Sequence, residues 1–454
     1  MEGLPEEAFG QVQDMFSSED WVVPKRVRFN VGGKLFETTS TTLAAAGRES
    51  YFGAMFDENG DMQMNPANEH FIDRNPDCFS VLLDLLRTGE LYIPQNVPEK
   101  LVYREALFYG LMDRIRLAKW GPLDGNRLQP SKSVTIHSSG DSTAIRASPD
   151  GGCCVAHGSM VHIYDWMLEE YPPITLDYQQ VNDACWIDPT GLVISTCDAG
   201  NGLFDSTTGE LKHKFDVTHE GVVKSYTSAA LTFDDGCNLF SSCKGQSNEY
   251  GIGVWDQNTG QQVDFYYEPP GWSLGDADKL QWFQGSNCLL VATLSSIKDN
   301  CYISLLDFRS KSMVWSWSDH GSLESSDDRW VRDAIGMEGN SSICVVNELG
   351  DLGFIDLRSG SGSVRWSSQS QLTKGKMPKE PCYPKLVLHD GQLFSSMNDC
   401  ISVFCGSDWD LTSRLKGSIG GSICDIAIGG NRLFALHSKE NVFDIWETPP
   451  PPIL

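Results

Sequence analysis

The alternation of hydrophobic and polar residues near the N-terminus predicts a strand, a tight turn and a second strand. In VRFNV (27–31), apolar residues alternate with polar ones, which is typical of a strand with one buried face. Gly32-Gly33 follows, and glycine adopts the positive φ angles of tight turns without steric penalty. The segment 34–37 starts the second strand, and the Thr/Ser residues of 38–42 can cap a following helix. We therefore expect a strand–turn–strand–helix unit.

Two later segments have the spacing of amphipathic helices. In 76–86, large apolar residues recur every three or four positions, which predicts one buried helix face. Pro76 suits the first turn of this helix and Gly89 its end. In VYREALFYGL (102–111), the same spacing predicts inward positions for Leu107, Phe108 and Leu111.

Beyond residue 130, short apolar runs alternate with turns rich in Gly, Asp, Ser and Asn, and one turn signal recurs seven times. Its glycines lie 39 to 54 residues apart, and short strands at this period predict four-stranded propeller blades. The last copy offers three strands, so SVTIHSS (133–139) is expected to supply the fourth and to remove an open sheet edge. We expect seven blades, with six or eight as alternatives. The repeat glycines are Gly151, Gly191, Gly236, Gly285, Gly339, Gly391 and Gly430.

The N-terminal motifs resemble a known family. VRFNVGGKLFETTSTTL (27–43) and FIDRNPDCFSVLLDLLRTGELYIP (71–94) resemble the BTB/POZ domain of the potassium-channel tetramerisation type. The later repeats resemble a degenerate WD-repeat propeller. Among the seven strand-end segments of these repeats, Trp255-Asp256 alone spells the WD dipeptide, and no copy has the Gly-His pair. Together they are similar to plant BTB/POZ proteins and to animal channel-tetramerisation-domain proteins with C-terminal propellers. The implied fold is a multidomain chain, with an α/β BTB/POZ domain followed by an all-β seven-bladed propeller.

The same patterns predict the domain boundaries. We expect an N-terminal extension at 1–25, a BTB/POZ domain at 26–113, a linker at 114–131, a propeller at 132–448 and a Pro-rich tail at 449–454.

Composition limits the partners. The formal net charge of −26 over 454 residues disfavours nucleic acid and anionic membrane surfaces. No apolar run approaches the roughly 20 residues that span a bilayer, so the channel pore is missing. No secretory signature is evident, and we expect a cytoplasmic protein, with the nucleus as a second location. The 14 cysteines include no CxxC pair, which favours free buried thiols over a metal site.

The sequence gives little support for catalysis, and we expect no cofactor or metal. No GxSxG, HExxH or P-loop motif is present. His157 and His162 lack a third ligand at matching spacing, so ordinary strand histidines are favoured over metal ligands. A propeller enzyme stays as a third hypothesis. Five aspartates recur at strand ends, where turn hydrogen bonding explains them better than a carboxylate ring: Asp165, Asp205, Asp256, Asp307 and Asp356.

The resemblance implies a docking function. BTB domains of this type assemble as homo-oligomers, here as a tetramer or pentamer, and many bind cullin-3. The chain would then be a substrate-specific adaptor of a cullin-3-RING ubiquitin ligase, whose propeller recruits a protein substrate. The alternative is an oligomeric scaffold that binds a channel, receptor or cytoskeletal partner without ligase activity.

The resemblance also implies where cullin-3 and the other protomers bind. In the loop after the second helix, Phe56-Asp57-Glu58 has the hydrophobic-x-acidic letters of cullin-binding BTB domains, but it precedes the usual position near Met62. Phe56 is alternatively a core residue. The candidate interface residues are Tyr51, Phe52, Phe56, Asp57, Glu58, Met62, Tyr103 and Tyr109.

Long propeller loops are the expected substrate site. The segments 268–279, 319–333 and 372–384 are longer than the other connections. Trp272, Arg329 and Trp330 are of the residue types that dominate protein interfaces, and they are our substrate-binding candidates.

Overall fold

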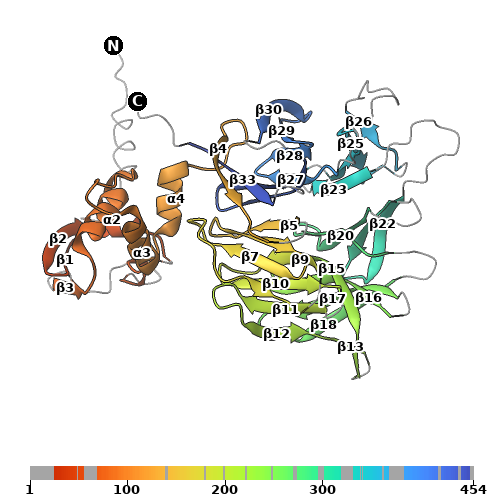
Figure 1. Ribbon diagram of the computed structural model, residues 1–454, viewed down its shortest axis with the longest axis horizontal. Helices are drawn as coiled ribbons and strands as arrows, with labels where there is room; N and C mark the ends of the chain where they lie inside the picture. The colour runs from red at the N-terminus through yellow and green to blue at the C-terminus, as the bar shows by residue number, and fades with distance from the viewer. Residues whose placement is uncertain are drawn as a thin grey trace, which may run out of the picture. The chain divides into compact units, whose positions relative to one another are not determined.

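The computed structural model divides the chain into two compact units, Met1–Lys119 and Trp120–Leu454, which are described separately (Figure 1). The structure describes residues 25–48, 50–55, 69–138, 142–177, 180–197, 200–219, 222–246, 249–268, 274–294, 301–318, 331–337, 339, 341–359, 362–367, 383–417, 421–437 and 441–449.

The N-terminal unit contains a three-stranded sheet in the order β2-β1-β3. β1 (Arg26–Val31) pairs antiparallel with β2 (Lys34–Thr39) and parallel with β3 (Glu69–Ile72). The predicted strand–turn–strand unit is therefore confirmed. At the turn, Gly32 has φ +52°, and a Cβ there would lie 2.6 Å from the carbonyl oxygen of Arg74.

The helices of this unit have clear end signals. The Asn75 side chain accepts hydrogen bonds from the backbone N–H groups of Asp77 and Cys78, and Gly89 ends the same helix with φ 78°. These contacts confirm the predicted start and end of this helix. The helices are α1 (Ser40–Ala44), the 3-10 turn η2 (Gly53–Met55), α2 (Pro76–Thr88), α3 (Glu99–Tyr109) and α4 (Met112–Trp120).

An aromatic core joins the sheet to the helices. Phe29 of β1 packs edge-on against Phe52 and Phe79, with ring centroids 5.9 Å apart in both pairs. Phe52 stacks on Tyr109 at 5.3 Å with an interplanar angle of 5°. All four residues are buried, so one face of the sheet is covered.

The predicted inward positions of Leu107 and Phe108 are wrong, whereas Leu111 is fully buried. The side chains of Leu107 and Phe108 are 59% and 44% exposed. The buried face of α3 instead carries Val102, Tyr103, Glu105, Ala106 and Tyr109, which repeat at helical spacing on the opposite side.

The described part of the second unit forms seven four-stranded antiparallel sheets. Each sheet consists of an inner strand, a second strand, a third strand and an outer strand, paired in that order. Each inner strand contacts the inner strand of the next sheet, and the last contacts the first, which makes a closed ring. The inner strands, which number the sheets one to seven, are β5 (Ser142–Ala147), β9 (Val181–Trp186), β15 (Tyr226–Phe233), β19 (Lys279–Phe283), β23 (Val331–Met337), β27 (Leu386–His389) and β31 (Ile423–Gly429).

The remaining strands complete these sheets, and apolar clusters fill the space between neighbouring sheets. The second strands are β6 (Cys153–His157), β10 (Gly191–Thr196), β16 (Asn238–Gly245), β20 (Cys288–Thr293), β24 (Ser342–Asn347), β28 (Gln392–Met397) and β32 (Arg432–His437). The third strands are β7 (Met160–Tyr164), β11 (Gly200–Asp205), β17 (Tyr250–Asp256), β21 (Tyr302–Asp307), β25 (Leu352–Asp356), β29 (Cys400–Cys405) and β33 (Val442–Glu447). The outer strands are β8 (Ile174–Thr175), β12 (Leu211–Phe215), β18 (Gln262–Tyr267), β22 (Ser312–Ser318), β26 (Arg365–Trp366), β30 (Asp410–Lys416) and β4 (Gln129–Thr135).

The ring closes through β4, which pairs antiparallel with β33 and is drawn as an orange strand beside blue ones in Figure 1. This confirms the predicted closure, although the strand starts at Gln129 rather than at residue 133. Ser133 of β4 donates to the Asp444 carboxylate, whose other oxygen lies 3.3 Å from Nε2 of the fully buried His437. A buried histidine is thus present without a Gly-His pair.

Two segments lie outside the ring of sheets. The predicted linker, 114–131, includes the end of α4 and the start of β4, so its part without helix or strand is 121–128. A separate hairpin, β13 (Val217–His219) and β14 (Val222–Lys224), follows the second sheet. In the described part of the chain, no helix has the length and apolar character needed to cross a membrane.

Candidate functional site

An exposed aromatic contact lies at the C-terminal end of α3. The Tyr51 ring is 38% exposed and lies 5.5 Å from the Phe108 ring, centroid to centroid. The Tyr51 N–H donates to the Tyr109 carbonyl at 2.9 Å, which fixes the loop against the helix. The Arg74 guanidinium lies 4.1 Å from the centre of the Phe108 ring. Tyr51, Leu107 and Phe108 are called the α3 patch below.

Buried groups hold the α3 patch in place. Arg74 also forms an ion pair with the buried Glu105, with 3.0 Å between Nε and Oε2. The Tyr109 ring packs edge-on against Tyr51 at 5.7 Å, and burial raises the pKa of Tyr109 well above its usual value. The patch therefore has rigid support, which favours binding because little freedom is lost on contact.

The uncovered face of the three-stranded sheet is a second exposed apolar surface. Leu35 of β2 and Phe71 of β3 both lie opposite Asn30 of β1 in the register, so they share one face. Their side chains are 64% and 65% exposed. This open sheet face can be covered only by another molecule or another part of the chain.

Three aspartates on inner strands tie neighbouring sheets of the ring together. Each carboxylate accepts the N–H of the next residue in its own strand, namely Ala184, Ala334 or Ile426. Its second oxygen accepts an N–H from the inner strand of the next sheet. These contacts are Leu231 N–H to Asp183, Leu386 N–H to Asp333 and Ile145 N–H to Asp425, at 3.1, 2.6 and 3.0 Å.

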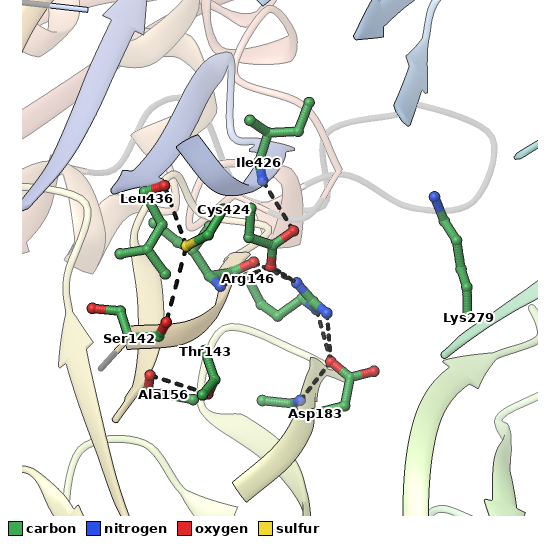
Figure 2. A network of polar contacts seen from close by, with 12 residues as sticks. Ser142, Thr143, Arg146, Ala156, Asp183, Lys279, Cys424, Ile426 and Leu436 are labelled. Carbon is green, nitrogen blue, oxygen red and sulfur yellow. Dashed lines mark hydrogen bonds and ion pairs between the residues drawn. The ribbon is translucent and has the colours of Figure 1, made fainter. Parts of the chain in front are cut away.

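Cations complete this central network. Figure 2 shows Arg146 pointing between Asp183 and the strand that carries Ile426. Its Nε lies 2.9 Å from Asp183, and its Nη1 lies 2.5 Å from Asp425. Burial alone would lower the pKa of Arg146, but the two carboxylates outweigh it and raise the pKa. Lys279 plays the same part beside Asp333, at 3.0 Å.

A cavity of about 400 Å³ lies at this network, with Arg146, Lys279, Lys385 and the three aspartates among its lining. Burial lowers the pKa of Lys385, but Asp333 and Asp425 raise it, and the pKa lies above its usual value. Because each of the three carboxylates already accepts two backbone N–H groups and a cation, the network holds the sheets together and is not arranged as an acid–base pair.

These three aspartates are not among the site residues predicted from the sequence. The available signal is an aspartate inside an otherwise apolar strand, as in VNDACW (181–186), VRDAIG (331–336) and ICDIAI (423–428). A buried carboxylate needs hydrogen-bond donors, and the backbone N–H groups of an inner strand beside another sheet supply them.

The recurring strand-end aspartates behave as predicted. Asp205 Oδ1 accepts the Thr207 N–H, Asp256 accepts the Asn258 N–H, and Asp307 accepts the Arg309 N–H, each two residues further on. Asp356 accepts the Arg358 N–H in the same way, and Asp165 accepts the Glu169 N–H, four residues further on. These are turn contacts.

The two predicted strand histidines have separate partners. The His157 Nε2 lies 2.7 Å from the Ser142 hydroxyl, and the His162 Nδ1 lies 2.7 Å from a Glu170 oxygen. Over the described residues, no three His, Cys, Asp or Glu side chains gather in a way that could hold a metal ion.

Comparison with known proteins identifies the family. A family model described as BTB/POZ domain matches residues 27–118, and one described as At2g24240-like, C-terminal beta propeller, matches residues 136–448. The chain belongs to this family of BTB/POZ propeller proteins. The predicted resemblance is confirmed.

Two plant relatives match the chain over almost its whole length, and an animal relative matches a shorter segment. BTB/POZ domain-containing protein At4g30940 of Arabidopsis thaliana is 68% identical over 437 residues, which cover 94% of this chain and 99% of the relative. At2g24240 from the same organism is 67% identical over 435 residues, with the same coverage. Human BTB/POZ domain-containing protein KCTD5 is 36% identical over 98 residues, 21% of this chain and 42% of the relative.

A solved structure supports the fold of the larger part. A chain in the crystal structure of a mitotic checkpoint complex has a TM-score of 0.51 and 12% identity, and the match covers 72% of this chain and 94% of that one. At this identity, the match supports the fold alone.

In the BTB/POZ domain, the predicted interface residues separate into two groups. Phe52, Tyr103 and Tyr109 are buried and support the domain from within, whereas Tyr51 is exposed. Tyr103 bonds Glu99 and Lys119 through its hydroxyl. The other candidates lie outside the described residues: Phe56, Asp57, Glu58 and Met62 in the BTB/POZ domain, and Trp272, Arg329 and Trp330 in the propeller.

Proposed function

We propose that this chain is a substrate-specific adaptor of a cullin-3-RING ubiquitin ligase. Its BTB/POZ domain assembles as a homo-oligomer, a tetramer or pentamer, and binds cullin-3, while the propeller recruits a protein substrate. The observation that supports this most is the α3 patch, a rigid and exposed aromatic surface on a BTB/POZ domain of the tetramerisation type. A second domain with a closed ring of sheets is then free to bind the substrate.

The chain's own contribution is proximity and not chemistry. Holding the substrate beside a ligase raises the effective concentration of one for the other, and several copies in one assembly increase avidity. We place this non-catalytic role in the cytoplasm, with the nucleus as a second location.

The open sheet face supports assembly. Leu35 and Phe71 expose large apolar side chains that a second copy of the domain would cover. Light scattering of the full chain tests this, and a mass of one chain across micromolar concentrations would contradict it.

The alternative is an oligomeric scaffold that binds a channel, receptor or cytoskeletal partner without a ligase. The observation that favours it is the sequence near Met62, which lacks the acidic residue expected two positions later. Both functions use the same assembly and the same propeller, and they differ in cullin-3 alone.

Binding of the N-terminal region of cullin-3 to the purified full chain separates the two functions. The adaptor predicts a complex that survives size-exclusion chromatography at micromolar concentration. Failure to bind at that concentration would leave the scaffold as the better account.

A further inference from the structure

Two neighbouring outer strands of the propeller have unprotected apolar edges. β18 has the sequence QVDFYY and β22 the sequence SMVWSWS, and each is the last strand of its sheet. The outer side of such a strand presents backbone N–H and C=O groups that can pair with another chain.

The other outer strands among the described residues have the features that block such pairing. β8 and β26 are two residues long. Charged or proline residues interrupt the longer ones, which is the usual protection of a sheet edge. They are Lys212 and Lys214 in β12, Pro130 and Lys132 in β4, and Arg414 and Lys416 in β30. β18 and β22 contain neither lysine, arginine nor proline, and their one charged residue, Asp264 of β18, is paired with Lys311.

The two unprotected strands line one groove. It has a volume of about 780 Å³ and is bounded by residues 265–268 and 311–316. Tyr266 and Met313 belong to the apolar cluster between the third and fourth sheets, so the groove has an apolar floor. Val314 at its wall is 53% exposed. Apolar surface that faces solvent beside an open strand edge is typical of a binding site.

Charged groups at the groove indicate the character of the occupant. Lys311 pairs with Asp264 at 2.9 Å, which neutralises both. One Glu268 oxygen accepts the Leu274 N–H at 3.1 Å, and within the described part of the chain no lysine, arginine or histidine forms an ion pair with that carboxylate. With a net charge of −26 on the whole chain, a basic group on the partner is favoured here.

We propose that the groove between β18 and β22 binds an extended segment of a protein partner, which adds as a strand to one of the two open edges. Its apolar side chains, on alternate residues, cover Tyr266 and Met313, and a lysine or arginine lies beside Glu268. Six residues of such a segment span roughly 20 Å, about the length of either strand. The identity of the partner as the recruited substrate rests on the proposed function.

Selection of a random dodecapeptide display library on the purified full chain tests the proposal. Enriched peptides are expected to alternate apolar and polar residues and to contain a lysine or arginine. Fluorescence anisotropy then compares the wild type with Val314→Lys, which adds a charge to the β22 edge. The matched control is Val222→Lys, at a valine of the β13–β14 hairpin that is also more than half exposed.

Val314→Lys is expected to weaken binding of the enriched peptides at least tenfold, and the control Val222→Lys is expected to weaken it less than twofold. N-methylation of alternate peptide amides, measured on the wild-type chain, is expected to weaken binding at least tenfold because it removes strand hydrogen bonds. The proposal is overturned if no peptide is enriched, if the N-methylated peptides bind equally well, or if Val314→Lys binds like the wild type. No cullin takes part, so this result and the cullin-3 result can fail separately.

Discussion

The Arg146 guanidinium bonds Asp425 at 2.5 Å, and this ion pair joins the first inner strand of the propeller to the last. The same side chain bonds Asp183 on the second inner strand. One residue therefore spans three sheets at the point where the ring closes.

Replacement of Arg146 by methionine is expected to destabilise the propeller. The replacement leaves two carboxylates near the centre of the propeller without their cation. For a fully buried pair, this lowers the free energy of unfolding by about 3–5 kcal/mol. Because the Arg146 side chain is 33% exposed, solvent screening reduces this, and we expect about 2–3 kcal/mol in the free energy of unfolding from urea titration. Arg309→Met, which removes an exposed ion pair with Asp307, should change it by less than about 0.5 kcal/mol. Equal losses in the two variants would contradict this role of Arg146.

The closing strand gives a second prediction. Ser133→Ala removes the donor to Asp444, which lies in the buried pair with His437, and should lower the free energy of unfolding by about 1–2 kcal/mol. Ser131→Ala in the same strand removes an exposed bond to Glu447 and should change it by less than about 0.5 kcal/mol. If Ser131→Ala proves the more damaging of the two, closure does not depend on the buried contact.

The turn of the BTB/POZ domain distinguishes two adjacent glycines. Both have positive φ, which costs an alanine about 1 kcal/mol. At Gly32, an added Cβ would also lie 2.6 Å from the Arg74 backbone oxygen, whereas at Gly33 nothing lies within 4 Å. Gly32→Ala should therefore lose at least about 2 kcal/mol and Gly33→Ala about 1 kcal/mol, measured by urea unfolding. A larger loss at Gly33 would show that the contact with Arg74 is not limiting.

Much of the BTB/POZ domain follows from its sequence because its end signals are local. The Asn75 cap, the Gly89 stop and the Gly32 turn each act within a few residues. The inward positions predicted for Leu107 and Phe108 failed for a physical reason. In EALFYGL, apolar residues occupy both sides of the helix, and which side is buried depends on where Phe52 and Phe79 lie in the folded domain.

The central network of the propeller could not be predicted from short stretches of the sequence. Asp183 and Arg146 are 37 residues apart, and Arg146 and Asp425 are 279 residues apart. Their meeting depends on ring closure, which the spacing of repeats predicts only in outline. The strand-end aspartates were predictable because their partners lie two to four residues away.

Buried thiols make the propeller sensitive to alkaline pH. Burial raises the pKa of Cys243 from 9.0 to about 12, and the same holds for Cys154. The unfolded chain loses these protons near pH 9 while the folded chain keeps them, so the free energy of unfolding falls as the pH rises from about 9 to about 12. Each thiol contributes up to about 1.4 kcal/mol per pH unit in this window.

Cys243→Ala should therefore flatten the pH dependence of the free energy of unfolding between pH 9 and 10.5. Leu203→Ala, in the same apolar cluster, should lower the stability but keep the wild-type slope. Urea titrations in the presence of a reductant measure both. A slope that Cys243→Ala leaves unchanged would remove this thiol as a cause.

The central claim is that the BTB/POZ domain binds cullin-3 through the α3 patch. The most direct test is to measure the affinity of three full-length proteins for the N-terminal region of cullin-3. These are the wild type, Leu107→Glu in the patch and Leu211→Glu at a leucine of the propeller that is also more than half exposed. The account predicts a Kd in the micromolar range or below for the wild type and for Leu211→Glu, and at least a tenfold weaker Kd for Leu107→Glu. No binding by the wild type, or equal binding by Leu107→Glu, would contradict it.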